Sequence, residues 1–141
     1  MAKQLNIAIV DVGSNIQPEK HLKLAKALIA RHHRLLGKSS VVRTAPLGDP
    51  NQSDYLNCAW KIATVLDRES FKAFLKATEE QLGREKSSPP HAPRTIDLDL
   101  IVWNNQVVHR NFLERDFVRR YTLEIAPELA DSLPAHPIPR S

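Results

Sequence analysis

The sequence has little of several things that define common protein classes. A single cysteine, Cys58, among 141 residues excludes an intramolecular disulfide framework and a cysteine-rich metal cluster, and is usual in a reducing cytosol. The four glycines form neither a Walker A pattern nor Gly-x-Gly-x-x-Gly, so any nucleotide site must work without the usual glycine loops. Aromatic residues make up 6% of the chain, which argues against an RNA-binding sheet that stacks bases.

Long apolar runs and a strong net charge are also missing. The first apolar stretch ends at Asp11 and is too short for the core of a signal peptide or for a membrane span. Twenty Lys and Arg against sixteen Asp and Glu leave a net charge of +4, which suits a small anionic ligand better than a nucleic acid. We therefore expect a cytoplasmic protein, monomeric, with no membrane or nucleic-acid partner.

Enough apolar residues are present, 42% of the chain, to build the core of one domain, which we expect to span residues 1–141 with an extended tail at 131–141. Periodicity predicts a strand at 5–10, a helix at 18–36 closed by Gly37, strands at 39–44 and 55–62, a helix capped by Asp67 and ended by Gly83, a loop at 84–94 and a strand at 96–103. This order is typical of ferredoxin-like α+β folds, with an antiparallel sheet and helices packed mainly on one face. Phe117-Val118 could begin a further strand, and residues 123–129 could form a helical turn.

The sharpest chemical feature is Asp97-Leu98-Asp99 on the last predicted strand. Side chains two residues apart share one face of a strand, about 6.5–7 Å apart at their α-carbons. Two carboxylates so placed repel each other, and Mg²⁺ would compensate them while keeping waters and substrate phosphate oxygens as further ligands. The alternative is a strand with ordinary solvent-facing acids.

Cations precede this carboxylate pair, because the loop before the strand carries Arg84, Lys86 and Arg94. Metal ions together with guanidinium and ammonium groups are what triphosphate binding requires. The alternative interpretation is a solvated loop with surface charges.

Tyr55 and Asn57 are predicted to share the strand face opposite Cys58 and Trp60. An aromatic ring beside an amide suits a flat heterocycle with a mixed hydrogen-bonding edge, although an exposed strand face explains the pattern equally well. Gly13-Ser14-Asn15 is either a tight turn with a helix N-cap or a close backbone approach to a ligand. Cys58 is expected to be buried and inert.

Taken together, these residues resemble the 6-hydroxymethyl-7,8-dihydropterin pyrophosphokinases of folate biosynthesis. The matching segments occur in family order: Gly13-Ser14-Asn15, Thr44 to Gly48, Gln52 to Asn57, Glu79 with Gly83-Arg84, Pro93 to Asp99, Arg115-Asp116-Phe117 and Glu124 to Pro127.

The resemblance implies a ferredoxin-like enzyme that transfers the β,γ-pyrophosphoryl group of ATP to the pterin hydroxymethyl oxygen and releases AMP. It implies that Asp97 and Asp99 hold two Mg²⁺ ions and that Arg84 and Arg94 are also catalytic. The phosphate-binding residues would be Arg84, Lys86, Arg94 and Arg115. The pterin pocket would be lined by Thr44, Leu47, Tyr55, Asn57 and Phe117.

The sequence departs from the family pattern mainly on the nucleotide side. Residues 104–114 lack the Pro-His signature of the family, and its role is not transferred to His109. His91 stands where an aromatic residue is common. A catalytically weakened paralogue that binds a pterin is therefore an alternative from a second class, and a ferredoxin-like binding module without activity is a third.

Overall fold

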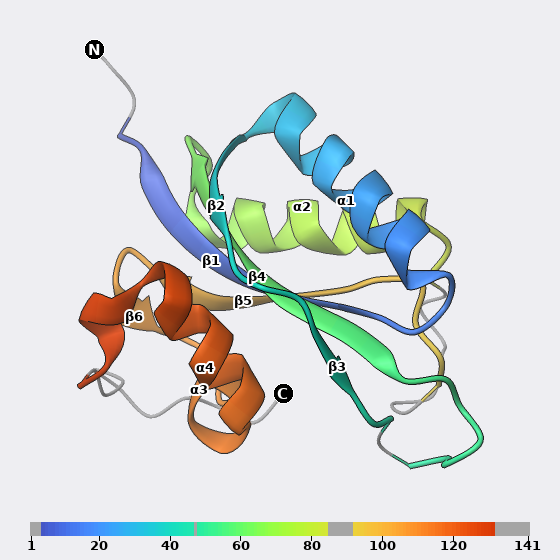
Figure 1. The fold of residues 1–141 in the computed structure, drawn as a ribbon. Coiled ribbons are helices and arrows are strands. Elements are labelled where there is room, and N and C mark those ends of the chain that lie inside the picture. The colour runs from blue at the N-terminus through green and yellow to red at the C-terminus, as the bar shows by residue number, and fades with distance from the viewer. Residues whose placement is uncertain (1–3, 47, 85–91, 132–141) are drawn as a thin grey trace.

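The computed structural model describes residues 4–46, 48–84 and 92–131. They form a six-stranded antiparallel sheet with helices on both of its faces (Figure 1). In chain order the elements are β1 (Asn6–Ser14), α1 (Pro18–His32), β2 (Arg34–Lys38), β3 (Val42–Thr44), β4 (Tyr55–Thr64), α2 (Arg68–Gln81), β5 (Asp97–Trp103), β6 (Gln106–Val107), α3 (Asn111–Glu114), α4 (Asp116–Ile125) and the 3-10 turn η1 (Pro127–Leu129).

Strand β1 lies at the centre of the sheet, between β4 and β5. Its residue Asp11 is in register with Ala59 of β4 and with Asp99 of β5. The outer edge of β4 pairs with two short strands, β2 toward one end and β3 toward the other. The predicted α+β class and the antiparallel sheet are confirmed, while the finer assignment to a ferredoxin-like fold stays a prediction.

One face of the sheet is covered by the two long helices. Alternate residues of the central strands, such as Val10 and Trp60, pack with Ile29 of α1 and Phe71 of α2 in a core of buried side chains. The starts of both helices follow from the sequence, since Pro18 occupies the first turn of α1 and Asp67 accepts a hydrogen bond from Ser70 N at 2.8 Å.

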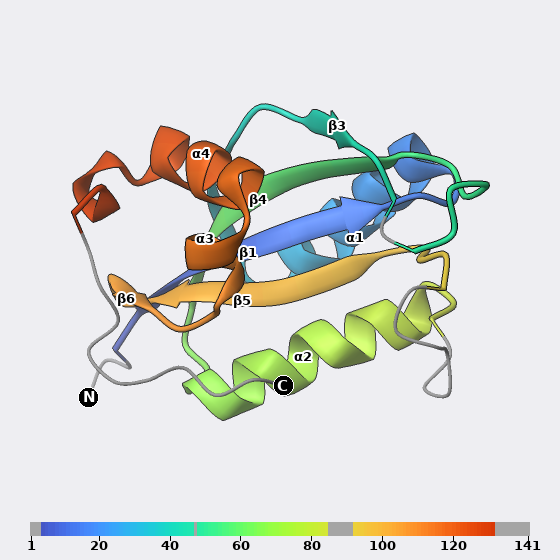
Figure 2. The ribbon, with the colours of Figure 1, turned by 90° about the horizontal axis from the view of Figure 1, so that it is seen from below.

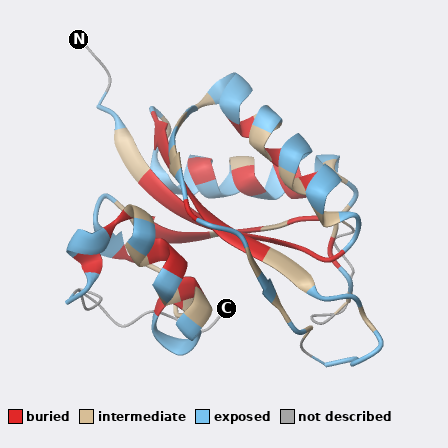
Figure 3. Ribbon diagram, in the orientation of Figure 1, coloured by how far each residue is buried: buried red, intermediate tan, exposed pale blue. Residues whose placement is uncertain are grey.

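The opposite face is covered over part of its length by α3, α4 and η1 (Figure 2). Here the other set of alternating residues, including Ile9, Ala59 and Ile101, packs against Phe112 and Val118. Figure 3 shows the resulting buried centre of the sheet, with exposed residues on the outer helix faces, in the loops and on the short strands β2 and β3. The remainder of this second face is open, and it carries the candidate site.

Three predictions about local structure are wrong, and one of the two alternatives for Gly13-Ser14-Asn15 is excluded. Helix α1 ends at His32, and the chain enters β2, so Gly37 lies in a strand and closes no helix. Residues 39–41 interrupt the strand expected at 39–44. Gly13 and Ser14 are the last residues of β1 and form no turn. Phe117-Val118 belongs to helix α4, because packing of the amphipathic segment 116–125 on the sheet overrides its local β-propensity.

Other predictions hold or fall outside the described residues. Helix α2 ends next to Gly83, whose φ of 103° suits glycine at a helix end. Residues 123–125 and 127–129 are helical, as expected. Most of the loop expected at 84–94 and nearly all of the 131–141 tail lie outside the described residues. Among the helices in the described ranges, none has the length and apolar character needed to cross a membrane.

The Cys58 thiol is shielded within the core, 2% exposed, and burial raises its pKa to about 12. Because the thiolate is the reactive form, the native protein should be alkylated by iodoacetamide at pH 8 at least about a hundredfold more slowly than the guanidinium-unfolded protein. Mass spectrometry over time measures both rates. A native rate within tenfold of the unfolded rate would contradict the shielding.

Candidate active site

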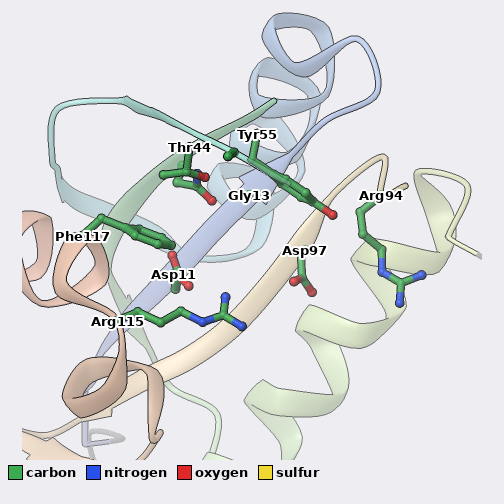
Figure 4. A pocket seen from close by; sticks show the side chains of 10 residues that line it. Asp11, Gly13, Thr44, Tyr55, Arg94, Asp97, Arg115 and Phe117 are labelled. Atoms are coloured by element: carbon green, nitrogen blue, oxygen red, sulfur yellow. The ribbon is translucent and has the colours of Figure 1, made fainter. Parts of the chain in front are cut away.

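The open half of the second sheet face forms a pocket of about 240 Å³ beside helix α4 (Figure 4). Strands β1, β4 and β5 supply its floor, because residues two apart on each strand point to the same side. It is lined by Asp11, Gly13, Thr44, Ala45, Tyr55, Asn57, Arg94, Asp97, Arg115 and Phe117.

One wall of the pocket is a fixed amide. Asn57 Nδ2 donates to Thr44 Oγ1 at 2.6 Å, which commits the amide nitrogen and leaves Oδ1 as an acceptor. A Cβ added to Gly13 would lie 2.9 Å from Asn57 Oδ1, so this strand position has room for no side chain. Gly13 is therefore needed for a close approach between neighbouring strands, with the amide of Asn57 occupying the space above it.

Aromatic rings flank this amide. Figure 4 shows the rings of Tyr55 and Phe117 on either side of the space above Gly13. Both residues are partly buried, and the Phe117 ring lies 6.1 Å from that of Tyr121. Two apolar rings with an acceptor amide between them form a slot that suits a flat heterocycle.

The acidic end of the pocket is organised by Arg84. Its Nη1 lies 2.8 Å from Asp97 Oδ1 and 2.8 Å from Glu79 Oε2. Glu79 also accepts from the backbone N of Leu98 at 2.7 Å, which fixes this group to β5. Burial raises the pKa of Glu79 to about 7, although the Leu98 hydrogen bond acts in the opposite direction. Arg84 thus holds Asp97 in place from the side of α2.

Asp99 and Asp11 extend this acidic region across to β1. They face each other in the β1–β5 register, each as the partner of the other across the two strands. Burial first, and then repulsion from Asp97 and Asp11, raises the pKa of Asp99 well above its usual range. Asp11 is 8% exposed and accepts a short hydrogen bond from the Tyr121 hydroxyl.

Arg94 is held at the mouth of the pocket by its backbone. Its N donates to Asn15 Oδ1 at 2.8 Å, and its carbonyl accepts from Asn15 N at 3.1 Å. The Asn15 amide also donates to Gln52 Oε1 and Ser53 O, at 3.1 Å each. Asn15 therefore ties together three segments that border the site. Arg115, by contrast, is exposed and reaches the pocket from the junction of α3 and α4.

The structure brings most of the sequence-predicted residues to one place. Those that line the pocket are Thr44, Tyr55, Asn57, Arg94, Asp97, Arg115 and Phe117. Arg84 and Asp99 lie next to Asp97 but do not line the pocket. Leu47 and Lys86 lie outside the described residues.

Sequence reasoning did not single out Asp11 or Ala45, whereas Gly13, for which a close backbone approach to a ligand is one of the two interpretations, does line the pocket. A signal for Asp11 was available, because a charged residue inside an otherwise apolar central strand is rarely without a partner or a function. His109, which stands near the missing Pro-His signature, does not line this pocket: its Nδ1 accepts from Asn111 N at 3.1 Å. Burial, and then Arg115, lowers the pKa of His109.

The donor set fits a hard divalent cation only in part. Asp97 and Asp99 offer carboxylate oxygens on one sheet face. Burial first, and then the neighbouring carboxylates, raises the pKa of Asp99, and a bound cation would offset both effects. Within the described ranges, however, no group of three or more His, Cys, Asp or Glu side chains is arranged to hold a metal ion. The remaining ligands would therefore have to come from water and a bound anion.

The close approach at Gly13 gives a stability prediction with an internal control. Gly13→Ala places a methyl group 2.9 Å from Asn57 Oδ1 and should cost about 1–3 kcal/mol in the free energy of unfolding. Gly37→Ala on β2 meets its nearest atom at 4.0 Å and should cost less than about 1 kcal/mol. Urea unfolding measures both variants. Equal losses would show that the contact with Asn57 is not the cause.

Known proteins are similar to this chain over most of its length. Residues 9–127 match the family described as 7,8-dihydro-6-hydroxymethylpterin-pyrophosphokinase (HPPK). The 2-amino-4-hydroxy-6-hydroxymethyldihydropteridine pyrophosphokinase of Bacillus subtilis is 33% identical over 135 residues, covering 88% of this chain and 80% of that protein. Those of Haemophilus influenzae and Methylorubrum extorquens are 30% and 33% identical, covering 86% of this chain and 82% and 84% of theirs. The chain therefore belongs to the HPPK family.

Proposed function

We propose that the protein transfers the pyrophosphoryl group of ATP to the hydroxymethyl oxygen of 6-hydroxymethyl-7,8-dihydropterin, giving AMP, as a step of folate biosynthesis. The observation that carries the proposal is a single pocket in which a slot for a flat heterocycle adjoins carboxylates and arginines (Figure 4). Family membership supplies the reaction. The new bond joins the pterin oxygen to the β-phosphorus, and the bond from the β-phosphorus to the AMP oxygen breaks.

The pterin would occupy the slot between Tyr55 and Phe117. The free Oδ1 of Asn57 is positioned to accept an N–H from the ring edge, because its Nδ2 is committed to Thr44. Leu47, predicted for the same pocket, remains a candidate that lies outside the described residues.

The triphosphate would lie along the edge where Arg94 and Arg115 border the pocket. Guanidinium groups offer paired donors to phosphate oxygens and neutralise charge that develops during transfer. Arg84 would have a different role, because its ion pairs with Asp97 and Glu79 make it a positioning residue for Asp97. Lys86, predicted to bind phosphate, lies outside the described residues.

Two Mg²⁺ ions are part of the proposal, held by Asp97 and Asp99. Bound there, Mg²⁺ would neutralise the triphosphate and the two carboxylates together. Burial of Asp99 next to Asp97 and Asp11 is the feature of this chain that favours such a cation. The protein itself contributes position and charge, with no covalent intermediate.

The enzyme is favoured over the alternatives. A paralogue that only binds a pterin would not need Asp97 and Asp99 side by side at the end of the slot, and the named relatives are pyrophosphokinases. An RNA-binding module is not supported by a face that carries three aspartates, Asp11, Asp97 and Asp99. We also propose that residues 1–141 act as one monomeric domain in the cytoplasm.

Asp97 gives the direct test of the activity. The protein with ATP, Mg²⁺ and 6-hydroxymethyl-7,8-dihydropterin should release AMP, and Asp97→Asn should reduce the rate by roughly a hundredfold or more, because it removes a charge that would hold the metal. Asp131→Asn, an exposed and distant change of the same kind, is the matched control and should keep the full rate. AMP is quantified by chromatography. Pterin binding without AMP release would favour the paralogue instead.

Metal removal gives a separate test of the carboxylate site. With EDTA in excess, AMP release should fall to background and should return when Mg²⁺ is added beyond the chelator. Pterin binding in the absence of nucleotide, measured by calorimetry, should change by less than about threefold, because the slot lies beside the carboxylates and not on them. Full activity in EDTA would exclude the proposed role of Asp97 and Asp99.

A further inference from the structure

Asp11 is a buried carboxylate on the floor of the pocket, and the proposed reaction gives it no task. It lies in the middle of the central strand β1, is 8% exposed and lines the pocket. Figure 4 shows its carboxylate between Phe117, Arg115 and Asp97, below the space that the aromatic slot encloses. A charge in this position is costly unless its oxygens are fully hydrogen-bonded.

The hydrogen bonds of Asp11 in the described residues do not use all of its oxygens. The Tyr121 hydroxyl, from helix α4, donates to Oδ1. An ionised carboxylate has about four lone-pair sites on its two oxygens, so the hydrogen bonds from Tyr121 and from the backbone N–H of Val12 leave acceptor capacity for a ligand. Because Asp11 is buried and lines the pocket, water reaches its carboxylate poorly, and a donor that enters the pocket would stabilise the charge.

The groups around Asp11 define which kind of donor can enter. Asp97 and Asp99 on β5 and Cys58 on β4 add no positive charge, and Arg115 is the cation that faces it from the start of α4. The apolar rings of Phe117 and Tyr55 admit a flat molecule more readily than a hydrated ion. A neutral ring that carries N–H groups fits this set better than an anion.

We infer that Asp11 is a specificity-determining residue, which accepts a hydrogen bond from a ring N–H of the bound pterin and is held in the required orientation by Tyr121. The inference rests on the proposed function, since it names a further contact with the same substrate. Asn57 and Asp11 would then supply two acceptors, from β4 and β1, to a ring whose N–H groups are its distinguishing feature. An analogue without these donors would leave a buried carboxylate unpaired and would be rejected.

Exchange of the acceptor for a donor tests this contact. In Asp11→Asn the amide oxygen can still accept from Tyr121, while the amide NH₂ replaces the oxygen that faces the pocket. The affinity for 6-hydroxymethyl-7,8-dihydropterin, measured by calorimetry with a non-hydrolysable ATP analogue and Mg²⁺ present, should fall by roughly tenfold to a hundredfold. The KM for the pterin should rise similarly, and kcat should change by less than about threefold.

Further variants separate a binding role from a structural one. Tyr121→Phe keeps the carboxylate but frees its orientation, so it should weaken pterin binding less than Asp11→Asn does. If Asp11→Asn does not fold, the double variant Asp11→Ala with Tyr121→Phe removes both polar partners together and should fold, because no polar group is left unpaired. It should show the same selective loss of pterin affinity.

The outcomes also distinguish this inference from the proposed function. If the unaltered protein neither binds the dihydropterin nor releases AMP, the proposed function fails. If it does both, and Asp11→Asn binds the dihydropterin within twofold of the unaltered protein, Asp11 does not contact the ring. A fall in kcat with unchanged pterin affinity would equally overturn the inference, because it would assign Asp11 to the chemical step.

Discussion

The two faces of strand β1 meet opposite requirements, and the rest of the structure depends on how the chain satisfies both. Toward α1 and α2 every second residue is apolar, as at Val10 and Val12, and the face is completely covered. Toward α4 the character changes along the strand, from Ile9 to Asp11 to Gly13. Helix α4 covers the apolar part of that face, so the polar part is left open as the pocket. The boundary of the core is thus also the boundary of the site.

Concentrating carboxylates on one open half-face has an electrostatic cost that the structure offsets only partly. Arg84 pairs with Asp97 and Glu79, whereas Asp11 and Asp99 keep raised pKa values because burial outweighs the compensation they receive. Such residual strain is typical of sites that acquire their missing charges from a ligand. Under the proposed function, a bound cation and ring N–H donors would offset this electrostatic cost.

How far the sequence could predict this structure depended on whether the signal was local. Alternation predicted that Asp97 shares a face with Asp99, and Tyr55 with Asn57, because a strand has a period of two residues. The end of α1 at His32 and the helical state of Phe117 could not be predicted, since pairing with β4 and packing on the sheet decide them. The Asp11–Tyr121 contact joins residues 110 apart in sequence, so no local pattern indicated it.

That contact also explains how the aromatic wall is positioned. Phe117 and Tyr121 are four residues apart on α4 and therefore lie on the same side of the helix. When the Tyr121 hydroxyl binds Asp11, the helix is fixed in rotation against β1, and Phe117 is brought to the edge of the pocket. A displacement of helix α4 along or around its axis would move the Phe117 ring with it. The same hydrogen bond therefore positions both the Phe117 ring and the Asp11 carboxylate, so under the proposed function ring stacking and edge recognition would be coupled.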